Sequence, residues 1–523
     1  MTSSKLSSIK VWIFCAALTA GLLSLTGCQK NKKPSIIIVA IDRLAFNTFS
    51  CGDDKQNLAS GLNILCKEGI RFTHAYTTST QPAAALGSLL TGLYPTQHKL
   101  HRSFDRLGAN VKTVQEHANN LGYRTYFFGG SPSVLRKTRL HTGFDIFDDA
   151  SFIEKKTYFV DFKFQTEKLL NILNEDKTQF FSLIHNSELE SLNEGETEVS
   201  SFEKLDDKIL TFFTQLKTRN LWDQNYIVVV GLQGESDYSR PAETPFSNLN
   251  SENTMVTLLI KPPRNKGDEG VSWKVDSPVS LADIGHSLWK TLADTSPPNQ
   301  NMLQDSFPIF DVSDTWLKQN KSLVLPPRRL LIESTDTWNR KLYVRFAVLL
   351  KNLVFIEGQK SQVFNTLTDG LESIDISKRQ KQFVDENSML LSKLRTENEL
   401  GIWVDHQSEW NSWVLTNREY WSKPNSRASI FKSELSRLNQ KSIAQPLSAL
   451  LLKHLGTNKK AAEIKNINVG PLPIKPGISY DLQKESFYEG AKLHSLNLAL
   501  ENIWGIWKPN QSWLYSDLIL ENQ

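Results

Sequence analysis

Three side chains that could bind or transform a charged ligand stand at the ends of predicted strands. Asp42 and Arg43 follow the apolar run Ile36 to Ile41, and His185 ends the run 179–185. Arg43 carries a permanent positive charge that could bind an anion, while a histidine at a strand end could transfer protons or be held by hydrogen bonds alone. Since open α/β sheets place their sites at the carboxyl ends of strands, we expect these residues at one edge of a sheet.

Short β-branched runs alternate with longer amphipathic segments from Ser35 onward, which is typical of a mainly parallel sheet covered by helices. We therefore predict an α/β fold with a large, mainly parallel central sheet flanked by helices. The predicted strands are residues 35–41, 125–129, 179–185, 226–231 and 255–261, and the predicted helices are residues 57–68, 111–120, 202–218 and 280–292.

Two proline-containing breaks, residues 297–305 and 326–327, indicate that the main domain ends near residue 325. We predict an α/β domain over residues 35–325 and a small antiparallel sheet domain over residues 326–387. Residues 388–523 are predicted to form a helical extension. It holds seven of the thirteen tryptophans, which could stack on sugars or pack helices onto the rest of the chain.

Residues 1–27 resemble the signal peptide of a bacterial lipoprotein. The apolar stretch Val11 to Leu25 is shorter than the roughly 20 residues that a membrane span needs, and residues 25–28 read Leu-Thr-Gly-Cys, like a lipobox. The resemblance implies cleavage before Cys28, lipid on its thiol, and a membrane-anchored chain with a tether at residues 28–34. It also implies a location in the bacterial cell envelope, and Gln29 after the cysteine favours the outer membrane.

The composition excludes some classes of protein. Sixty basic and 56 acidic side chains leave a formal net charge of +4. This charge is too small for a protein that binds the phosphate backbone of nucleic acids, so we expect no nucleic-acid partner. The four cysteines provide no disulfide scaffold. Cys51 and Cys66 could pair in an oxidising envelope or remain two packed thiols.

Six stretches of the chain carry a recognisable pattern: IIIVAIDRLAFNTFSCG (36–52), NLASGLNILCKEGIRFTHAYTTS (57–79), GSLLTGLYPTQHKL (87–100), TVQEHANNLGYRTYFFG (113–129), GFDIFDD (143–149) and YIVVVGLQGE (226–235). Together, and in this order, they resemble the sulfatase family of the alkaline phosphatase superfamily. The resemblance covers about residues 35–385 and implies the family's fold. It also implies the family's chemistry, in which a formylglycine made from Cys or Ser and a calcium ion cleave sulfate esters.

The residues that would hold the family's metal ion are mostly replaced. Asp42 matches the first of the paired metal-binding aspartates, but Arg43 follows it, and its charge opposes a cation. At the second pair of ligands the chain has Leu232, which cannot coordinate a metal, and Gln233, which offers a neutral amide oxygen. We therefore predict that Asp42 is a vestigial ligand, that Gln233 is the other candidate ligand, and that the protein holds no metal cofactor.

The nucleophile segment also departs from the family. Counted back from Ser88, Pro82 occupies the position of the modified Cys or Ser, and Leu86 that of the motif's arginine. Thr80 could act as a nucleophile if the motif is shifted by two residues. His185 is the candidate for proton transfer.

These replacements predict a pseudoenzyme, a membrane-anchored lipoprotein that kept the sulfatase fold and lost the metal site and the nucleophile. Its pocket could bind an anion through Arg43 or His185. The expected partners are the membrane, through the anchor at Cys28, and either a sulfated or anionic glycan or a protein of the envelope.

Two alternatives stay open. The first is an active hydrolase of sulfuric or phosphoric esters, with Thr80 as nucleophile and a calcium ion held by Asp42 together with Glu235 or Asp237. The second is an assembly lipoprotein that uses the sulfatase domain as a scaffold and its tryptophan-rich end to hold a partner.

Overall fold

The computed structural model describes the greater part of residues 33–402. The described ranges are 33–49, 51, 60–102, 105–131, 133–134, 136–151, 159–190, 198–234, 249–265, 272–293, 298, 309–310, 325–338, 341–358 and 360–402. The predicted signal peptide (residues 1–27), Cys28, Glu235, Asp237 and the tryptophan-rich segment 403–523 lie outside them. The chain divides into Met1–Pro34 and Ser35–Gln523, and the fold below is that of the second unit.

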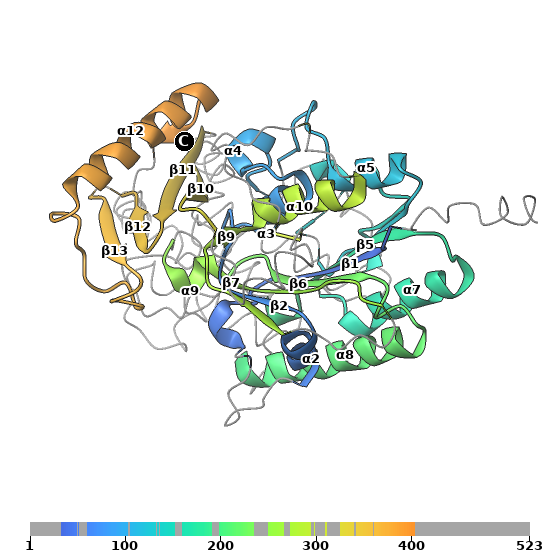
Figure 1. Ribbon diagram of the computed structural model, residues 1–523. Coiled ribbons are helices and arrows are strands. Elements are labelled where there is room, and N and C mark those ends of the chain that lie inside the picture. Colours follow the sequence, from blue (N-terminus) through green and yellow to red (C-terminus); the bar gives the residue numbers. More distant parts are fainter. Residues whose placement is uncertain are drawn as a thin grey trace, which may run out of the picture. The chain divides into compact units, whose positions relative to one another are not determined.

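The main sheet contains nine strands among the described residues, in the order β4-β3-β5-β1-β6-β7-β2-β8, with β9 paired to β2 (Figure 1). They are β1 (Ile36–Ile41), β2 (Ile70–Tyr76), β3 (Arg124–Phe128), β4 (Ile146–Asp148), β5 (Phe180–Asn186), β6 (Tyr226–Gly231), β7 (Met255–Lys261), β8 (Trp273–Val275) and β9 (Val279–Ser280). Strand β7 is antiparallel to β6 and β2, and the other described pairs are parallel. The prediction of a mainly parallel sheet is therefore confirmed.

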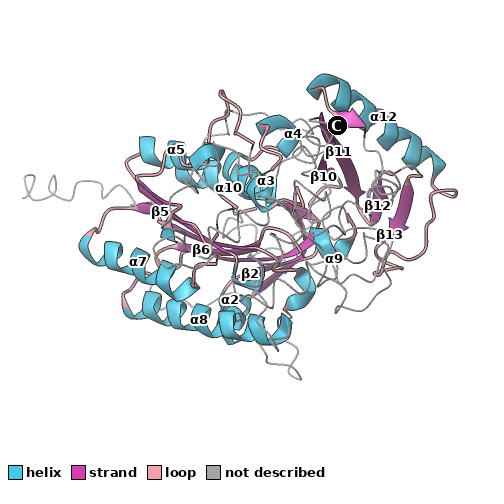
Figure 2. Cartoon of the chain, turned by 180° about the vertical axis from the view of Figure 1, so that it is seen from behind, coloured by secondary structure: helices cyan, strands magenta, loops and turns pink. Residues whose placement is uncertain are grey.

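Helices cover both faces of this sheet. The longer ones are α2 (Ser60–Glu68), α3 (Pro82–Thr91), α5 (Val114–Asn120), α7 (Phe162–Glu175), α8 (Glu198–Thr218) and α10 (Leu281–Ala293); the short ones are η1 (Phe46–Thr48), α4 (Pro95–His98), η2 (Arg136–Thr138), η3 (Glu188–Glu190) and α9 (Ser251–Thr254). Figures 1 and 2 show α2, α7 and α8 on one face and α3, α5 and α10 on the other.

The two faces explain why β1 is apolar at every position. Ile36, Ile38 and Ala40 belong to the core on the α3, α5 and α10 side, whereas the alternate residues of the strand belong to the core on the α2, α7 and α8 side. All six side chains are fully buried, and burying each isoleucine stabilises the fold by about 1.5 to 3 kcal/mol. The strand is thereby fixed in the middle of the sheet with its carboxyl end toward the polar residues that follow it.

The predicted strands and helices of the main domain are present, but β2 and α7 were not among the predicted elements. In β2, Arg71, Thr73 and His74 interrupt the apolar pattern, and Arg71 and His74 are only half buried. The Thr73 hydroxyl donates to the carbonyl of Val275 and to the Asp276 carboxylate. A polar strand with such partners gives no continuous apolar run for a sequence pattern to detect.

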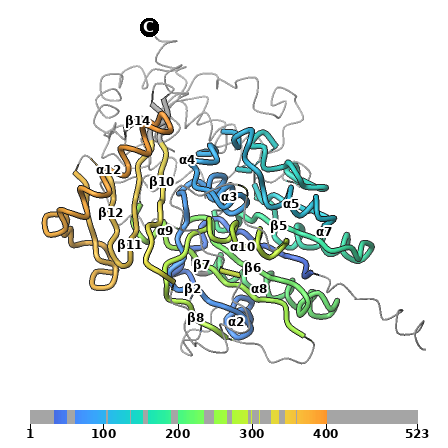
Figure 3. Tube along the Cα trace, turned by 45° about the horizontal axis from the view of Figure 1, so that its top comes forward, coloured from blue at the N-terminus to red at the C-terminus, as the bar shows by residue number. Residues whose placement is uncertain are grey.

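A second, antiparallel sheet follows in the order β10-β11-β12-β13, with β14 paired to β11. Its elements are β10 (Arg329–Trp338), β11 (Lys341–Leu350), β12 (Leu353–Ile356), β13 (Gln362–Asn365), β14 (Gly401–Ile402) and the helix α12 (Lys381–Asn398). Helix α12 lies beside the strands of this sheet (Figure 3), and Phe383, Leu391 and Leu394 of the helix belong to one apolar cluster with residues of β10 to β13. The predicted small antiparallel sheet is confirmed, and the predicted boundary after residue 387 falls inside α12.

Cys51 and Cys66 form a disulfide bond with their Cα atoms 5.8 Å apart. Of the two possibilities that the sequence left open, the structure therefore has the pairing. Among the described residues, no helix combines the length and the apolar character that a membrane crossing requires.

Candidate functional site

The carboxyl ends of β5, β1 and β6 lie side by side at one edge of the main sheet. In the parallel register, Ile41 pairs with Asn186 on one side and with Gly231 on the other. The pairing continues one step past the strands, because the Asp42 N–H donates to the Asn186 carbonyl and the Leu232 N–H donates to the Ile41 carbonyl, both at 2.9 Å. The structure thus brings Asp42 and His185 together, as predicted from their strand ends.

The Asp42 carboxylate is fully buried and bound by protein donors. Its Oδ2 atom accepts hydrogen bonds from His185 Nε2 at 3.0 Å and from the Ser187 hydroxyl at 2.6 Å. Ser187 Oγ also hydrogen-bonds Ser131 Oγ at 3.0 Å. Asp42 Oδ1 and His185 Nδ1 have no hydrogen-bond partner. We call Asp42, Ser131, His185 and Ser187 the Asp42 cluster.

Ser131 and Ser187 were not predicted as site residues. Each follows a strand of the main sheet, Ser131 after β3 and Ser187 after β5, which is the signal that singled out Asp42. Serine is common in such turns for local reasons, so this signal becomes specific only when the strand order places the two turns beside Asp42.

Polar residues behind the cluster hold the end of β5. Gln165 Nε2 donates to the carbonyls of His185 at 2.7 Å and Phe128 at 3.0 Å, so it ties the ends of β5 and β3 together. Asn186 Nδ2 donates to Gln165 Oε1 at 3.1 Å and to Glu188 Oε1 at 3.3 Å. The backbone position of His185 is therefore set by groups outside the cluster itself.

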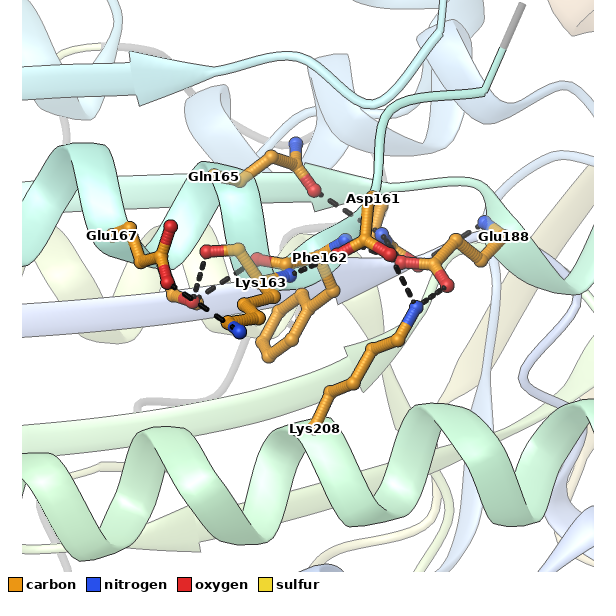
Figure 4. Close-up of polar contacts among 9 residues, drawn as sticks. Asp161, Phe162, Lys163, Gln165, Glu167, Glu188 and Lys208 are labelled. Atoms are coloured by element: carbon orange, nitrogen blue, oxygen red, sulfur yellow. Dashed lines mark hydrogen bonds and ion pairs between the residues drawn. The ribbon is translucent and has the colours of Figure 1, made fainter. Parts of the chain in front are cut away.

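An ion-pair network lies at the outer side of these contacts. Figure 4 shows Lys208 of α8 between Glu188 and Asp161, at 2.5 and 2.7 Å from their carboxylates. Burial lowers the pKa of Lys208, but its bonds to these two carboxylates outweigh that effect and raise the pKa above its ordinary value. Asp161 also caps α7 by accepting from the Lys163 N–H at 2.8 Å.

Arg43 directly follows Asp42 and has a backbone φ of 61°. Non-glycine residues seldom adopt this left-handed conformation, and such residues concentrate at functional sites. The sharp turn leads the chain away from the end of β1 into η1. The predicted anion-binding residue therefore stands at the same strand end as the Asp42 cluster.

Gln233 lies beyond the end of β6, at the same edge. Its Nε2 atom donates to Glu190 Oε1 at 3.4 Å, and its Oε1 atom is buried with no partner. Leu232 is completely buried. Gln233 thus offers one free amide oxygen to the site.

These residues do not fit a calcium ion. A hard divalent cation takes six or more oxygen ligands, usually including several carboxylates. At this edge, Asp42 Oδ2 already accepts two hydrogen bonds, which leaves Asp42 Oδ1 and Gln233 Oε1 as the buried oxygens without partners. In the described part of the chain, no group of three or more His, Cys, Asp or Glu side chains is arranged to hold a metal.

The segment that would carry the nucleophile begins α3. Pro82 is the first residue of this helix, a position that proline favours because no N–H bond is lost there. Leu86 is completely buried among apolar neighbours. The two positions that the resemblance assigns to the nucleophile and its arginine are thus occupied by structural residues.

Thr80 is held by the small sheet. Its N–H donates to the Glu333 carbonyl of β10 at 3.2 Å, and the Glu333 N–H donates to the Thr78 carbonyl at 2.9 Å. Thr80 is 4% exposed. The structure therefore places Thr80 in a buried bridge between the two sheets.

A second buried histidine and carboxylate meet beside this bridge. His101 Nδ1 lies 2.7 Å from Glu333 Oε1, and both side chains are buried. Glu333 Oε2, Thr78 Oγ1 and Gln81 Nε2 are buried without partners. Unused donors and acceptors therefore gather around the residues that precede α3.

His98 is a third buried histidine, and its ring contacts Ser88 and the backbone of Leu100. The Leu100 N–H donates to His98 Nδ1 at 3.1 Å, so the ring hydrogen is on Nε2, which lies 3.1 Å from Ser88 Oγ. Burial lowers the pKa of His98 to about 3. His98 is therefore a neutral residue that fixes the turn after α4.

Comparison with known proteins gives one family. Residues 34–189 match the family described as Sulfatase. The uncharacterized sulfatase YidJ of Escherichia coli is 32% identical over 98 residues, which are 19% of this chain and 20% of YidJ. An N-acetylgalactosamine-6-O-sulfatase of Bacteroides thetaiotaomicron is 33% identical over 87 residues, 15% of this chain and 17% of that protein. The aligned part thus spans about a fifth of these relatives.

Solved structures cover much more of the chain. Ps i-CgsB in complex with k-i-k-neocarrahexaose superposes with a TM-score of 0.55 at 16% identity, over 73% of this chain and 97% of that one. A structure described as a complex with its substrate D-glucosamine-2-N,6-O-disulfate gives 0.55 at 13% identity, over 70% and 98%. The phosphonate monoester hydrolase of Agrobacterium radiobacter gives 0.52 at 13% identity, over 70% and 96%. The fold is that of these proteins.

Proposed function

We propose that this chain, a member of the sulfatase family through residues 34–189, binds a sulfated or otherwise anionic glycan and does not cleave it. The observation that carries the proposal is Pro82, which begins α3 at the position that the family's motif gives to its nucleophile. Proline has no hydroxyl or thiol, so it can neither attack a sulfate ester nor be converted to a formylglycine.

The surroundings of Pro82 support the absence of cleavage. A transition state with developing negative charge needs positive partners held in place. The residue at the motif's arginine position is the buried Leu86, and the Asp42 carboxylate is engaged by His185 and Ser187. The nucleophile and the arginine of the family's motif are therefore replaced, and the aspartate that remains, Asp42, is already engaged by protein donors.

The proposed ligand class rests on the relatives and on the donors of this chain. Relatives are described as acting on N-acetylgalactosamine 6-O-sulfate linkages and on a glucosamine disulfate. In this chain, Arg43 stands at the strand edge, and the buried Gln81 Nε2 at the start of α3 has no acceptor. A helix start and a guanidinium both favour a sulfate group.

The test combines binding and turnover on the purified protein. Calorimetric titration with D-glucosamine-2-N,6-O-disulfate and N-acetylgalactosamine 6-sulfate, and with the unsulfated sugars, should show binding that requires sulfate, with no free sulfate on ion chromatography. Arg43→Ala should weaken binding about tenfold, which corresponds to ~1.4 kcal/mol. Arg124→Ala is the matched control, because Arg124 is an exposed residue at the opposite end of a strand of the same sheet.

Two outcomes would contradict the proposal. Equal affinity of wild type and Arg43→Ala for every sulfated sugar would remove Arg43 from the site. Release of sulfate, or of phosphate from an aryl phosphate, that disappears in Thr80→Ala would instead establish the active hydrolase with Thr80 as nucleophile.

We further propose that the chain is a lipoprotein of the bacterial envelope, anchored through Cys28 and located in the outer membrane. The lipobox-like sequence at residues 25–28 supports this, and the Cys51–Cys66 disulfide suits an oxidising compartment. Radiolabelled palmitate should be incorporated into the wild type and not into Cys28→Ala, and fractionation should move that variant out of the membrane. Label in both proteins would overturn the anchor.

A further inference from the structure

We infer that the Asp42 cluster takes the structural place of a divalent cation, so that the carboxyl edge of the main sheet is held together by hydrogen bonds and is independent of metal. The inference rests on the proposed function in one premise only, which is that this chain has replaced site residues of the sulfatase family. It assigns Ser187, His185 and Ser131 a role that the sequence did not indicate.

Two protein donors already occupy Asp42 Oδ2. A carboxylate oxygen has two lone pairs, and both are used, by His185 Nε2 at 3.0 Å and by the Ser187 hydroxyl at 2.6 Å. A cation at this oxygen would have to displace donors whose hydrogens face it. The three side chains are completely buried, so His185 Nε2 would lose its partner without reaching water, and Ser187 would keep only Ser131 Oγ.

The members of the Asp42 cluster come from the ends of three strands. Asp42 extends from β1, His185 and Ser187 from β5, and Ser131 from β3. The cluster therefore joins the ends of three adjacent parallel strands, which is what a bridging metal ion does when its ligands come from several strands. One oxygen, Asp42 Oδ2, has two contacts to β5, and Ser187 continues the connection to β3.

The backbone is shaped for this close approach. A Cβ atom on Gly130 would come within 2.5 Å of the His185 carbonyl oxygen and 2.8 Å of the Asn186 Cα atom. Only glycine therefore lets the turn after β3 lie against the end of β5. Gln165 joins the same two strand ends from behind through the carbonyls of Phe128 and His185.

The residues on the other side of Asp42 also disfavour a metal ion. Arg43 adds a permanent positive charge at the next position, which disfavours a second cation nearby. Across the strand pair, Leu232 is an apolar, completely buried side chain. Of the described residues that follow β6, Leu232 supplies no oxygen and Gln233 supplies one neutral amide oxygen, which is too few ligands for a calcium ion.

The experiment measures metal content and thermal unfolding of the purified full chain. After dialysis against calcium and then against buffer, elemental analysis should find less than stoichiometric calcium. The melting temperature should agree within about 1 °C in EDTA and in millimolar CaCl2, since a ligand that binds the folded state would raise it by several degrees. Stoichiometric calcium that raises the melting temperature would overturn the inference.

Variants show whether the cluster itself holds the edge. Ser187→Ala removes one donor and should lower the melting temperature equally in EDTA and in calcium. Asp42→Asn keeps an acceptor and should lower it further, again without a calcium effect, whereas Asp207→Asn on the exposed face of α8 should leave it unchanged. If Ser187→Ala and Asp42→Asn melted like Asp207→Asn, the cluster would have no structural role and the inference would fail.

The two proposals fail in different ways. A protein that binds calcium through Asp42 and still releases no sulfate would contradict the metal-independent edge and leave the glycan-binding function intact. A metal-free protein that releases sulfate would do the reverse. Should Asp42→Asn not fold, the wild-type metal content and Ser187→Ala still decide the inference.

Discussion

Two buried pairs of a histidine and a carboxylate hold different parts of this molecule. His185 and Asp42 meet at 3.0 Å and both are completely buried, while His101 and Glu333 meet at 2.7 Å with side chains that are 5% and 1% exposed. In each pair one carboxylate oxygen, Asp42 Oδ1 or Glu333 Oε2, has no partner. The two pairs have nearly the same chemistry, but their surroundings differ.

The Asp42 carboxylate accepts from two side chains, His185 and Ser187, whereas the Glu333 carboxylate has one side-chain partner among the described residues, His101. Asp42 Oδ2 accepts from Ser187 as well as from His185, so its loss leaves the buried His185 Nε2 without a partner and leaves Ser187 only Ser131 Oγ. The Glu333 main chain pairs with Thr78 and Thr80, and this bridge between the sheets does not need the carboxylate. Two pairs with the same chemistry therefore contribute unequally to stability. Removing the Asp42 pair should lower the free energy of unfolding more than removing the Glu333 pair.

The largest effect is expected for Asp42→Leu. Removing the acceptor of two buried donors should lower the free energy of unfolding by about 3 to 5 kcal/mol. Urea unfolding followed by tryptophan fluorescence measures it, with Asp207→Leu as an exposed control that should change stability by less than about 0.5 kcal/mol. A loss below about 1 kcal/mol for Asp42→Leu would mean that His185 and Ser187 find other acceptors.

The third buried histidine sharpens the comparison through pH, because His98 has no carboxylate to stabilise its charged form. Its pKa is lowered to about 3 by burial, and an exposed histidine has a pKa of about 6.5. Below pH 6.5 the unfolded chain therefore binds a proton that the folded chain does not. The free energy of unfolding should fall as the pH falls from 6.5 toward 3, by up to about 1.4 kcal/mol per pH unit from this group.

The measurement is urea unfolding of the wild type and His98→Gln between pH 7 and 4.5. The difference between the two proteins removes the contribution of other titrating groups, and the wild type should lose up to about 2.7 kcal/mol more than the variant over two pH units. Parallel curves for the two proteins would show that His98 takes up a proton in the folded state without cost.

A smaller effect is expected for Glu333→Leu. It leaves His101 Nδ1 without its carboxylate, at a cost of about 1 to 3 kcal/mol. The Thr80 N–H, which donates to the Glu333 carbonyl, should keep its protection from hydrogen exchange. Glu386→Leu, which breaks the half-exposed pair of Glu386 and Arg329, should cost less than about 1 kcal/mol. Lost protection at Thr80 would show that side chain and backbone act together.

The carboxyl edge of the main sheet could be predicted because the sequence of β1 has a distinctive pattern. The run Ile36 to Ile41 is apolar at every position, and a strand buried on both faces must end where polar residues begin. Since parallel strands end at a common edge, Asp42 and His185 could be assigned to the same edge from their sequence positions, while their contact depends on β1 and β5 being neighbours. The fold class and the small antiparallel sheet followed from the same kind of pattern.

The partners of these residues could not be predicted, for two physical reasons. Ser131 and Ser187 become cluster members only through the order of β3, β5 and β1, which no local pattern contains. Glu333 meets His101 across 232 positions of sequence, and nothing near either residue indicates the other. Hydrogen-bond partners of a buried group are fixed by tertiary structure, so the residue types at strand ends predict where a site lies and not how it is satisfied.

The smallest effect is expected at the outer side of the Asp42 cluster, in Lys208→Met. Lys208 pairs with Glu188 and Asp161 and is only partly exposed, so its loss should cost about 0.5 to 1 kcal/mol. Most of this difference should vanish in 1 M NaCl, since partly exposed ion pairs are screened at a Debye length of about 3 Å. The control is Lys163→Met, whose pair with Glu167 is more exposed and longer, at 3.9 Å.

A cost of Lys208→Met that persisted in 1 M NaCl would point to a different origin. Glu188 also accepts from the Asn186 side chain and from the Phe162 N–H, so an uncompensated Glu188 could disturb the end of β5 and, through it, His185. Hydrogen exchange at the Asp42 N–H, which donates to the Asn186 carbonyl, separates the two cases. Unchanged protection there would show that the Asp42 cluster is held by its own hydrogen bonds and by Gln165, without help from the surface ion pairs.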